Sequence, residues 1–394
     1  MDADASSLRD LWTLPPGIAY LNHGSFGPSP RSVQKAARAW SDQVEAQPME
    51  FFLQRMELAQ QATCERISEF AGTSDRNIVL MDNATVAMNV VAATVELNSG
   101  DEVLLTNHEY GSVRRIWKRR CAVVGARVVT VFLTPEDTCQ TDFVVDQLFA
   151  ATTKRTRLIV VSHVTSSTSL VLPVKAVCSE ARRRGIPVCV DGPHAVGMLS
   201  FSLDDLGCDF YTASCHKWMC APFGSGFLYA HSAHHGRMQP VIISWGGSIS
   251  GRSRSWKDEY TWMGTRDPAP MLSVSAAIDF LEEVGVPRFR EHSADLILGA
   301  QRRLNAAAGL VPLASESSAH RLPMISISLP VPDGWKSPAH GAADPLQIRL
   351  RERYQIEIPV FGWNGQRLLR ISCHLYNSEA DIDRLVDALE QELP

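Results

Sequence analysis

Short apolar runs alternate with amphipathic stretches along the first two thirds of the chain. Continuous apolar runs are typical of strands that are buried on both faces of a parallel sheet. Apolar residues spaced three and four apart are typical of helices that pack one face on such a sheet. This pattern predicts strands at residues 77–81, 102–106, 127–133, 156–164, 187–190, 209–213 and 226–230. It predicts helices at residues 32–47, 50–71, 86–97, 143–151 and 173–184.

The order of these elements indicates the fold class. Strands and helices that alternate between residues 77 and 217 predict an α/β fold with a mostly parallel sheet. From residue 271 the pattern changes to helices at 272–284, 291–307, 345–353 and from 378, with strands at 324–329, 356–360 and 368–372. We therefore expect an N-terminal arm (1–19), a large domain (20–270) and a smaller α+β domain (271–394).

Two polar side chains stand at the ends of neighbouring predicted strands. Asp191 follows the run 187–190, and Lys217 follows the run 209–213 after three further residues. Open α/β sheets bind ligands at the carboxyl edge of their strands. Pyridoxal 5'-phosphate (PLP) needs a lysine that holds it as a Schiff base and an acid beside its pyridine nitrogen. A turn-capping Asp and a surface Lys are the alternative, which the nearby His194 disfavours.

Composition and charge argue against several other classes of protein. The chain has 394 residues, of which 45% are hydrophobic and 21% charged, as in a globular protein with a large core. Its formal net charge is -5 with no dominant basic tract, so we expect no nucleic-acid partner. No apolar run approaches the roughly 20 residues of a membrane span. Nine cysteines without a Cys-x-x-Cys pair fit reduced thiols, and the polar N-terminus is unlike a secretory signal, so we expect a cytoplasmic protein.

Three further features of the sequence bear on possible ligand binding. Asn83 or Thr85 can cap the helix 86–97, and a helix N-terminus offers N–H groups to a phosphate. Arg370 interrupts an apolar strand, and a buried guanidinium needs an anion, either a substrate carboxylate or a structural acid. The histidines near residue 231 look like an exposed turn without a carboxylate or cysteine, so we expect no metal site.

The motifs around the two strand ends resemble a known family. Asp-Gly-Pro-His-Ala-Val-Gly at 191–197 and Ser-Cys-His-Lys-Trp at 214–218 resemble the class V branch of fold-type I PLP enzymes. The nearest resemblance is to the isopenicillin N epimerase-like group, which also holds cysteine-conjugate and cysteine-sulfoxide C–S lyases. Residues 20–30, 260–268 and 368–385 extend the resemblance over nearly the whole chain. It implies a PLP-dependent transferase fold with a mostly parallel seven-stranded sheet, in which strand 226–230 is antiparallel.

The resemblance implies roles for residues that contact the cofactor. Lys217 would hold PLP and act as the base, Asp191 would pair with the ring nitrogen, and His194 would bond the ring hydroxyl. The implied phosphate contacts are Ala84, Thr85, Ser214 and His216. The implied ring contacts are Tyr110, with His108 as the alternative for stacking, and a weaker hydroxyl contact from Thr165.

The resemblance also implies substrate contacts and a partner. Arg370 would bind the α-carboxylate of an amino acid. Asn22, His23 and Gly24 are further candidates, with a backbone-bonded turn as the alternative for them, and Trp363 is a candidate for the substrate pocket. Gly264 and Thr265 would reach the phosphate of the other subunit in a homodimer.

The sequence indicates the cofactor more specifically than it indicates the reaction. Removal of the α-proton by Lys217 leads to β-elimination, epimerisation or transamination, and loss of the carboxylate would give decarboxylation coupled to oxidative deamination. Cysteine desulfurases need a nucleophilic cysteine upstream of the carboxylate-binding arginine, and residues 310–370 contain none. The resemblance favours β-elimination of a cysteine S-conjugate or sulfoxide, because C–S lyase activity recurs in the resembled group and needs only one base, with epimerisation as the alternative. A non-catalytic PLP-fold protein is the other class, which the Lys217, Asp191 and Arg370 set opposes.

Overall fold

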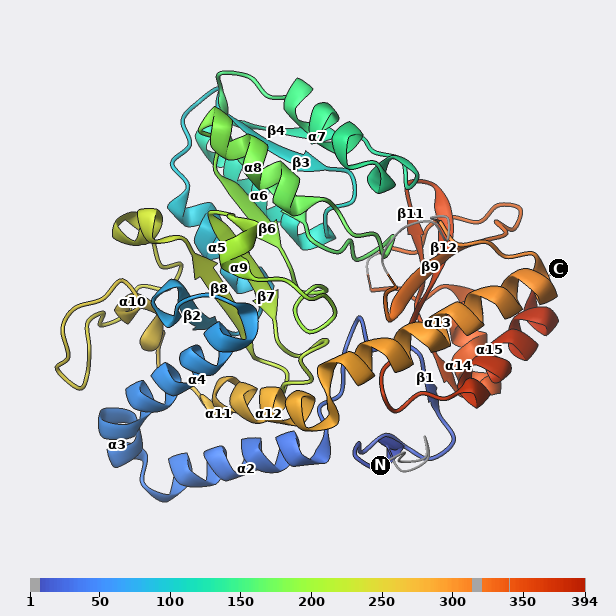
Figure 1. The fold of residues 1–394 in the computed structure, drawn as a ribbon, viewed down its shortest axis with the longest axis horizontal. Helices are drawn as coiled ribbons and strands as arrows, with labels where there is room; N and C mark the ends of the chain where they lie inside the picture. Colours follow the sequence, from blue (N-terminus) through green and yellow to red (C-terminus); the bar gives the residue numbers. More distant parts are fainter. Residues whose placement is uncertain (1–7, 314–320, 340, 394) are drawn as a thin grey trace. The chain divides into compact units, whose positions relative to one another are not determined.

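The computed structural model describes residues 8–313, 321–339 and 341–393. The chain forms two compact units, described separately here and drawn in Figure 1. The large unit comprises Ser32–Thr165 and Val171–Phe280, and the small unit comprises Met1–Arg31, Ser166–Leu170 and Leu281–Pro394. Relative to the predicted limits, residues 20–31, 166–170 and 271–280 fall on the other side of this division. Residues 1–7 of the predicted arm lie outside the described residues.

The large unit is built on a seven-stranded sheet with the order β2-β8-β7-β6-β5-β3-β4. Strands β4, β3, β5, β6 and β7 are parallel, and β8 is antiparallel to both β7 and β2. The predicted α/β class, the mostly parallel sheet and the antiparallel strand 226–230 are thus confirmed. The strands are β2 (Ile78–Met81), β3 (Glu102–Thr106), β4 (Arg127–Val131), β5 (Thr156–Ser162), β6 (Val188–Asp191), β7 (Phe210–Ser214) and β8 (Gly226–Ala230).

Helices cover both faces of this sheet. Helices α5 (Ala84–Thr94) and α6 (Gly111–Val124) bury apolar side chains on one face, and α8 (Val174–Arg184) lies on the viewer's side in Figure 1. None of the helices formed by the described residues is both long and apolar enough to cross a membrane. The other helices of this unit are α2 (Arg31–Ala46), α3 (Pro48–Glu50), α4 (Met56–Ala71), α7 (Thr141–Ala150), α9 (Leu203–Leu206), α10 (Asp258–Thr261), α11 (Ala269–Leu272) and α12 (Val274–Val284).

The small unit packs helices on a three-stranded antiparallel sheet with the order β11-β12-β9. A separate parallel pair joins β1 to β10. Leu296, Ile327, Leu369 and Leu385 belong to one buried apolar core. The strands are β1 (Ala19–Tyr20), β9 (Met324–Leu329), β10 (Ile356–Glu357), β11 (Val360–Trp363) and β12 (Gln366–Ser372). The helices are α13 (Val286–Ala308), α14 (Pro345–Tyr354) and α15 (Glu379–Glu392).

Two predicted elements are interrupted in the structure. The predicted strand 356–360 is two strands, because Pro359 has no N–H to donate to a ladder and separates β10 from β11. The predicted helix 50–71 begins with a π-helical turn at Phe51–Arg55 before α4 continues to Gly72, its left-handed C-cap.

The segment that carries the histidines at 231–235 is largely exposed, as the sequence indicates, but one of its histidines is buried. These histidines lie in and next to a 3₁₀ helix, Ser232–Arg237, and His234 is buried. The Nε2 atom of His234 lies 2.5 Å from Oδ1 of Asp209, so a carboxylate is present after all. Asp209 precedes β7, and the pair joins that strand to the 3₁₀ helix.

Gly192 stands directly after β6, where the backbone passes close to Tyr211. A Cβ atom at position 192 would lie 2.0 Å from a carbon of the buried Tyr211 ring. Because the core is close-packed, the ring cannot move aside without displacing its neighbours. We expect Gly192→Ala to lower the free energy of unfolding by about 1–3 kcal/mol, measured by denaturant unfolding. Gly111→Ala is the control, because a Cβ there meets nothing within 4 Å; equal midpoints for the two variants would contradict the packing argument.

Candidate active site

The carboxyl ends of β6 and β7 bring the three predicted catalytic residues together. Asp191 is the last residue of β6, and Lys217 follows shortly after the end of β7. The Nζ atom of Lys217 lies 2.8 Å from Nε2 of His194. The Thr212 hydroxyl of β7 donates to Oδ1 of Asp191 at 2.8 Å. Parallel neighbouring strands therefore place the acid and the lysine at one edge of the sheet, where open α/β sheets bind ligands.

The electrostatics of Asp191 suit a cationic partner. Burial raises the pKa of Asp191 to about 6, and the Thr212 hydrogen bond and the charge of Lys217 oppose that rise. No described residue forms a salt bridge with this carboxylate. A cation placed beside it would favour the ionised form and would itself be stabilised. The protonated ring nitrogen of PLP is such a cation, so the site fits the cofactor.

Trp218 determines which nitrogen of His194 carries a proton. Its indole N–H donates to Nδ1 of His194 at 3.4 Å. An indole N–H can only donate, so a neutral His194 carries its own proton on Nε2. His194 can therefore donate from Nε2 to an oxygen near Lys217, as the predicted contact with a ring hydroxyl requires.

The predicted phosphate contacts gather at the N-terminus of α5. Asn83 is the N-cap, and its side chain accepts a hydrogen bond from Val86 N at 3.0 Å, which selects it from the two predicted caps. The N–H of Ala84 donates to the Ser214 hydroxyl at 2.9 Å, and Thr85 is exposed in the same first turn. The helix end and the end of β7 thus present N–H and O–H groups at one place, as a phosphate requires.

His216 adds a further polar atom near these groups. Its Nδ1 is buried and has no hydrogen-bond partner among the described residues. Burial, and then the charge of Lys217, lower the pKa of His216 to about 4. A buried nitrogen without a partner is costly, and a bound anion would remove that cost. The four predicted phosphate contacts therefore form a chemically suitable set.

The loop after β3 separates the two candidates for covering the cofactor ring. His108 is buried, its Nε2 lies 3.0 Å from the Leu133 carbonyl oxygen, and burial lowers its pKa to about 4. Tyr110 is 49% exposed and is the N-cap of α6. The arrangement favours Tyr110, because the imidazole of His108 already bonds the backbone. Thr165 is fully buried after β5.

Arg370 belongs to the small unit, where it lies in the middle of β12 and is 4% exposed. Its guanidinium donates to the Ser166 carbonyl at 2.7 Å, to the Ser166 hydroxyl at 3.2 Å and to the Ser25 hydroxyl at 2.5 Å. All three oxygens are uncharged, so these contacts orient the guanidinium without neutralising it. A carboxylate is the anion that such a fork-shaped cation binds best.

The N-terminal candidates lie beside the end of β12. Asn22 forms an isolated parallel β-bridge with Ser372 through the backbone. A Cβ atom at Gly24 would lie 2.8 Å from the Ser372 hydroxyl oxygen. Trp363, the last residue of β11, is 8% exposed. Asn22, Gly24 and Trp363 as substrate contacts stay predictions.

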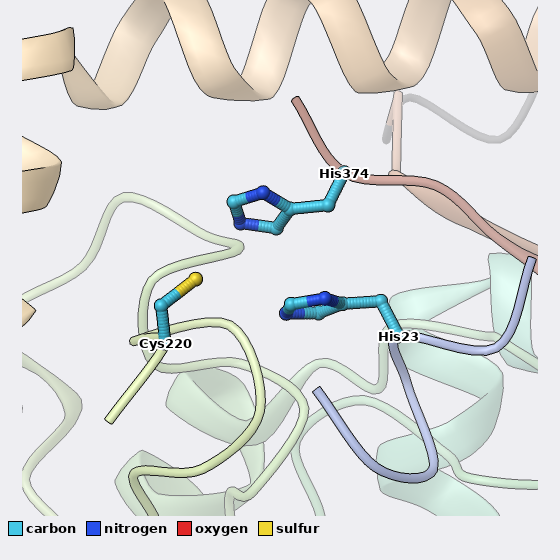
Figure 2. A group of neighbouring side chains, drawn as sticks. All are labelled: His23, Cys220 and His374. Carbon is cyan, nitrogen blue, oxygen red and sulfur yellow. The ribbon is translucent and has the colours of Figure 1, made fainter. Parts of the chain in front are cut away.

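His23 is packed into a buried aromatic group of the small unit. Its ring stacks on His374 with the centroids 4.2 Å apart, as Figure 2 shows, and its Nδ1 lies 2.9 Å from the Tyr376 hydroxyl. Both imidazoles are fully buried, and burial is the first cause of a lowered pKa at His374. The described contacts of His23 are those of a core residue, so its role toward a substrate stays a prediction.

The loop that carries Thr265 is anchored next to the α5 N-terminus. Arg266 forms a salt bridge with Asp82 at 2.5 Å, and Asp82 directly precedes the N-cap Asn83. Gly264 adopts a left-handed conformation with φ of 97°, and Thr265 is exposed. The contact of Thr265 with a second subunit stays a prediction.

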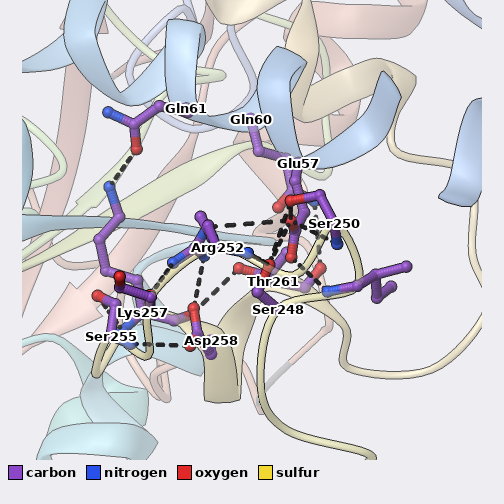
Figure 3. Close-up of polar contacts among 12 residues, drawn as sticks. Glu57, Gln60, Gln61, Ser248, Ser250, Arg252, Ser255, Lys257, Asp258 and Thr261 are labelled. Atoms are coloured by element: carbon purple, nitrogen blue, oxygen red, sulfur yellow. Dashed lines mark hydrogen bonds and ion pairs between the residues drawn. The ribbon is translucent and has the colours of Figure 1, made fainter. Parts of the chain in front are cut away.

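Sequence reasoning missed the residue that holds the long loop 245–262. Glu57 of α4 accepts hydrogen bonds from the Ser248 hydroxyl at 2.8 Å, from Ile249 N at 2.8 Å and from Ser250 N at 3.1 Å, as drawn in Figure 3. Burial opposes ionisation of Glu57, but these hydrogen bonds lower its pKa overall. The partners are more than 190 residues apart in sequence, so no local pattern could indicate this contact.

The sheet topology, the strand-end Lys217 and Asp191 and the phosphate-type helix end together define a PLP enzyme fold. The family described as aminotransferase class-V matches residues 19–385. The chain therefore belongs to the aminotransferase class-V family and is a PLP-dependent enzyme. The family and the fold that the sequence motifs indicate are confirmed.

Similar proteins in the family are named for different reactions. The chain is 35% identical over 402 residues to isopenicillin N epimerase of Amycolatopsis lactamdurans, covering 98% of each chain. It is 28% identical over 407 residues to a probable chloroplastic L-cysteine desulfhydrase of Arabidopsis thaliana, covering 95% of this chain and 82% of that protein. The solved structure of the cystine C–S lyase C-DES with cysteine persulfide has a TM-score of 0.81 at 22% identity, covering 96% of this chain and 99% of that chain. That structural likeness shows the fold alone.

Proposed function

We propose that the protein cleaves the C–S bond of a cysteine S-conjugate or its sulfoxide by β-elimination. Water and the substrate would give pyruvate, ammonia and a thiol, or a sulfenic acid from a sulfoxide. The observation that carries the proposal is the contact of Lys217 with His194. When Lys217 is unprotonated, its Nζ can accept a hydrogen bond from the Nε2–H of a neutral His194, and the contact places this basic amine at the carboxyl edge of the sheet. One base is all that this reaction needs.

Each predicted residue then has a defined task. When bound, PLP supplies an electron sink that stabilises negative charge at the substrate α-carbon. Asp191 stabilises the positive charge on the ring nitrogen of PLP, and His194 donates a hydrogen bond from Nε2 to the ring hydroxyl. Lys217 removes the α-proton and carries it as an ammonium group. In the small unit, Arg370 would bind the substrate carboxylate.

Cysteine-based desulfurase chemistry has less support. Residues 310–370 contain no cysteine. Cys373 follows β12, is fully buried in the apolar core, and burial raises the pKa of its thiol. A thiol becomes a nucleophile as its thiolate, which this environment disfavours. Among the named relatives, the probable L-cysteine desulfhydrase is consistent with the proposal.

Epimerisation of an amino-acid centre is the second candidate. The observation that favours it is the 35% identity over 98% of both chains with an isopenicillin N epimerase, against 28% with the desulfhydrase. Epimerisation needs a second proton donor on the opposite face of the α-carbon, in addition to Lys217. Transamination, or decarboxylation coupled to oxidative deamination, would use the same cofactor site.

We also propose a homodimer in which the Gly264–Thr265 loop reaches the phosphate of the other subunit, and a cytoplasmic location. The exposure of Thr265 supports the first point. The nine cysteines, all of them free thiols, support a reducing compartment.

The reaction is tested by product analysis of the PLP-loaded protein in deuterated water with a panel of cysteine S-conjugates and their sulfoxides. We expect pyruvate and the matching thiol or sulfenic acid in equal amounts. Deuterium at the α-carbon of recovered substrate without pyruvate would overturn the proposal in favour of epimerisation. A 2-oxo acid that keeps its sulfur would indicate transamination, and an aldehyde with carbon dioxide would indicate decarboxylation.

A further inference from the structure

A second buried carboxyl group lies at the same edge of the sheet as Asp191. Glu109 follows β3 and is 3% exposed. The Thr106 hydroxyl donates to its Oε1 at 2.7 Å, and the Ser162 hydroxyl donates to its Oε2 at 2.7 Å. Ser162 ends β5 and is the register partner of Asp191 on β6. The carboxyl groups of Glu109 and Asp191 therefore occupy the same edge of the sheet, with Ser162 between them.

Near pH 7, two of the titratable groups around these carboxyls stay protonated and one histidine stays neutral. The other titratable groups that face them are His108, His163, Cys189, Tyr211 and Lys217. Burial raises the pKa of the Cys189 thiol and of the Tyr211 phenol, so both stay protonated. Burial lowers the pKa of His108, which is therefore neutral.

The charge of Asp191 influences the ionisation of Glu109. Burial raises the pKa of Glu109 to about 7, the hydrogen bonds from Ser162 and Thr106 oppose this, and the charge of Asp191 adds to it. Two like charges in a buried site are not both ionised without cost, and their titrations are coupled. A cation that neutralises Asp191 removes the repulsion and so lowers the pKa of Glu109. Binding of such a cation near pH 7 then releases a proton from Glu109.

We propose that Glu109 is a positioning residue for the cofactor, acting through Asp191. Its carboxyl holds a proton beside Asp191 when the site is empty and gives it up when the protonated ring nitrogen pairs with Asp191. The negative charge gained at Glu109 then reinforces the pairing. Its hydrogen bonds to Thr106 and Ser162 also fix the loop that presents Tyr110. This role concerns the cofactor and is independent of which reaction follows.

The test is the number of protons released when PLP binds to the full-length protein freed of cofactor, measured by titration calorimetry in buffers of different ionisation enthalpy. Glu109→Gln mimics the protonated acid and keeps groups that can hydrogen-bond Thr106 and Ser162. We expect the unsubstituted protein to release more protons than Glu109→Gln, by up to about one per site, with the largest difference near pH 7. Protons that come from PLP or from Lys217 are common to both proteins and cancel.

Two further variants keep the test decisive. Glu102→Gln is the matched control, because Glu102 is a buried acid at the other end of β3 that pairs with Arg127, and it should leave proton release unchanged. Ser162→Ala removes one hydrogen bond to the ionised Glu109, so the pH of maximal release should rise. Equal proton release by the unsubstituted protein and Glu109→Gln between pH 6 and 8, or no shift with Ser162→Ala, would overturn the proposal.

Discussion

Replacing Lys217 by alanine is expected to reduce turnover of every amino-acid substrate by about 10²–10⁴-fold or more, because general-base catalysis contributes that much on its own. Lys217→Arg is expected to fail similarly, since a guanidinium does not lose its proton in a protein. The measurement is the steady-state rate of product formation by PLP-supplemented protein at saturating substrate.

Lys257→Ala is the matched control for the lysine substitution. Lys257 also lies in the large unit, but its Nζ donates to Gln61 Oε1 at 2.9 Å and to the Asp75 carbonyl at 3.2 Å in the network of Figure 3. Its loss removes these hydrogen bonds and should affect stability more than turnover. Retention of more than about a tenth of the activity by Lys217→Ala would contradict its role as the base.

Arg370→Met is expected to lower kcat/KM by about 30-fold to several thousand-fold, which corresponds to about 2–5 kcal/mol for truncating one partner of a buried charge pair. The hydrogen bonds of Arg370 to Ser166 and Ser25 orient the guanidinium for a substrate carboxylate, so we expect the loss to fall on substrate binding. Arg370→Lys should recover only part of the activity, because an ammonium lacks the two-pronged geometry. Initial rates over a range of substrate concentrations separate KM from kcat.

Arg367, on the same strand, is the control for Arg370, because it forms an ion pair within the protein. It pairs with the fully buried Asp344 at 2.5 Å, so Arg367→Met leaves a buried carboxylate uncompensated and should cost about 3–5 kcal/mol of stability. Arg370→Met should cost less stability, because the Ser166 and Ser25 oxygens that lose their hydrogen bonds are uncharged. If Arg370→Met destabilises the protein as much as Arg367→Met does, Arg370 is a structural residue and the carboxylate assignment is wrong.

The sequence was most informative where a local pattern decides the structure. The strands 102–106, 226–230 and 324–329 agree with β3, β8 and β9 residue for residue, because each is a short segment rich in apolar residues and bounded by polar residues or proline. Asp191 and Lys217 could be placed at strand ends for the same reason. The parallel order of the strands then fixed the shared edge.

Contacts between distant segments could not be predicted in this way. Glu109 carries no sequence signal that distinguishes it from an exposed acid, and its burial depends on hydroxyl groups from β3 and β5. The same is true of Glu57, whose partners lie in the loop 245–262. The pairing of β1 with β10 joins segments more than 300 residues apart, so the strand predicted at 356–360 gave no indication of its partner, and the two residues of β1 are too few to be recognised alone.

The central claim is that Lys217, at the end of β7, holds PLP beside Asp191. Borohydride reduction of the PLP-loaded protein would make the bond between lysine and cofactor permanent, and peptide mass mapping would then locate it. The account predicts the added mass on the peptide that contains Lys217, and no visible absorbance band of lysine-bound PLP in Lys217→Ala. Modification of Lys257 or of another lysine in place of Lys217 would contradict it.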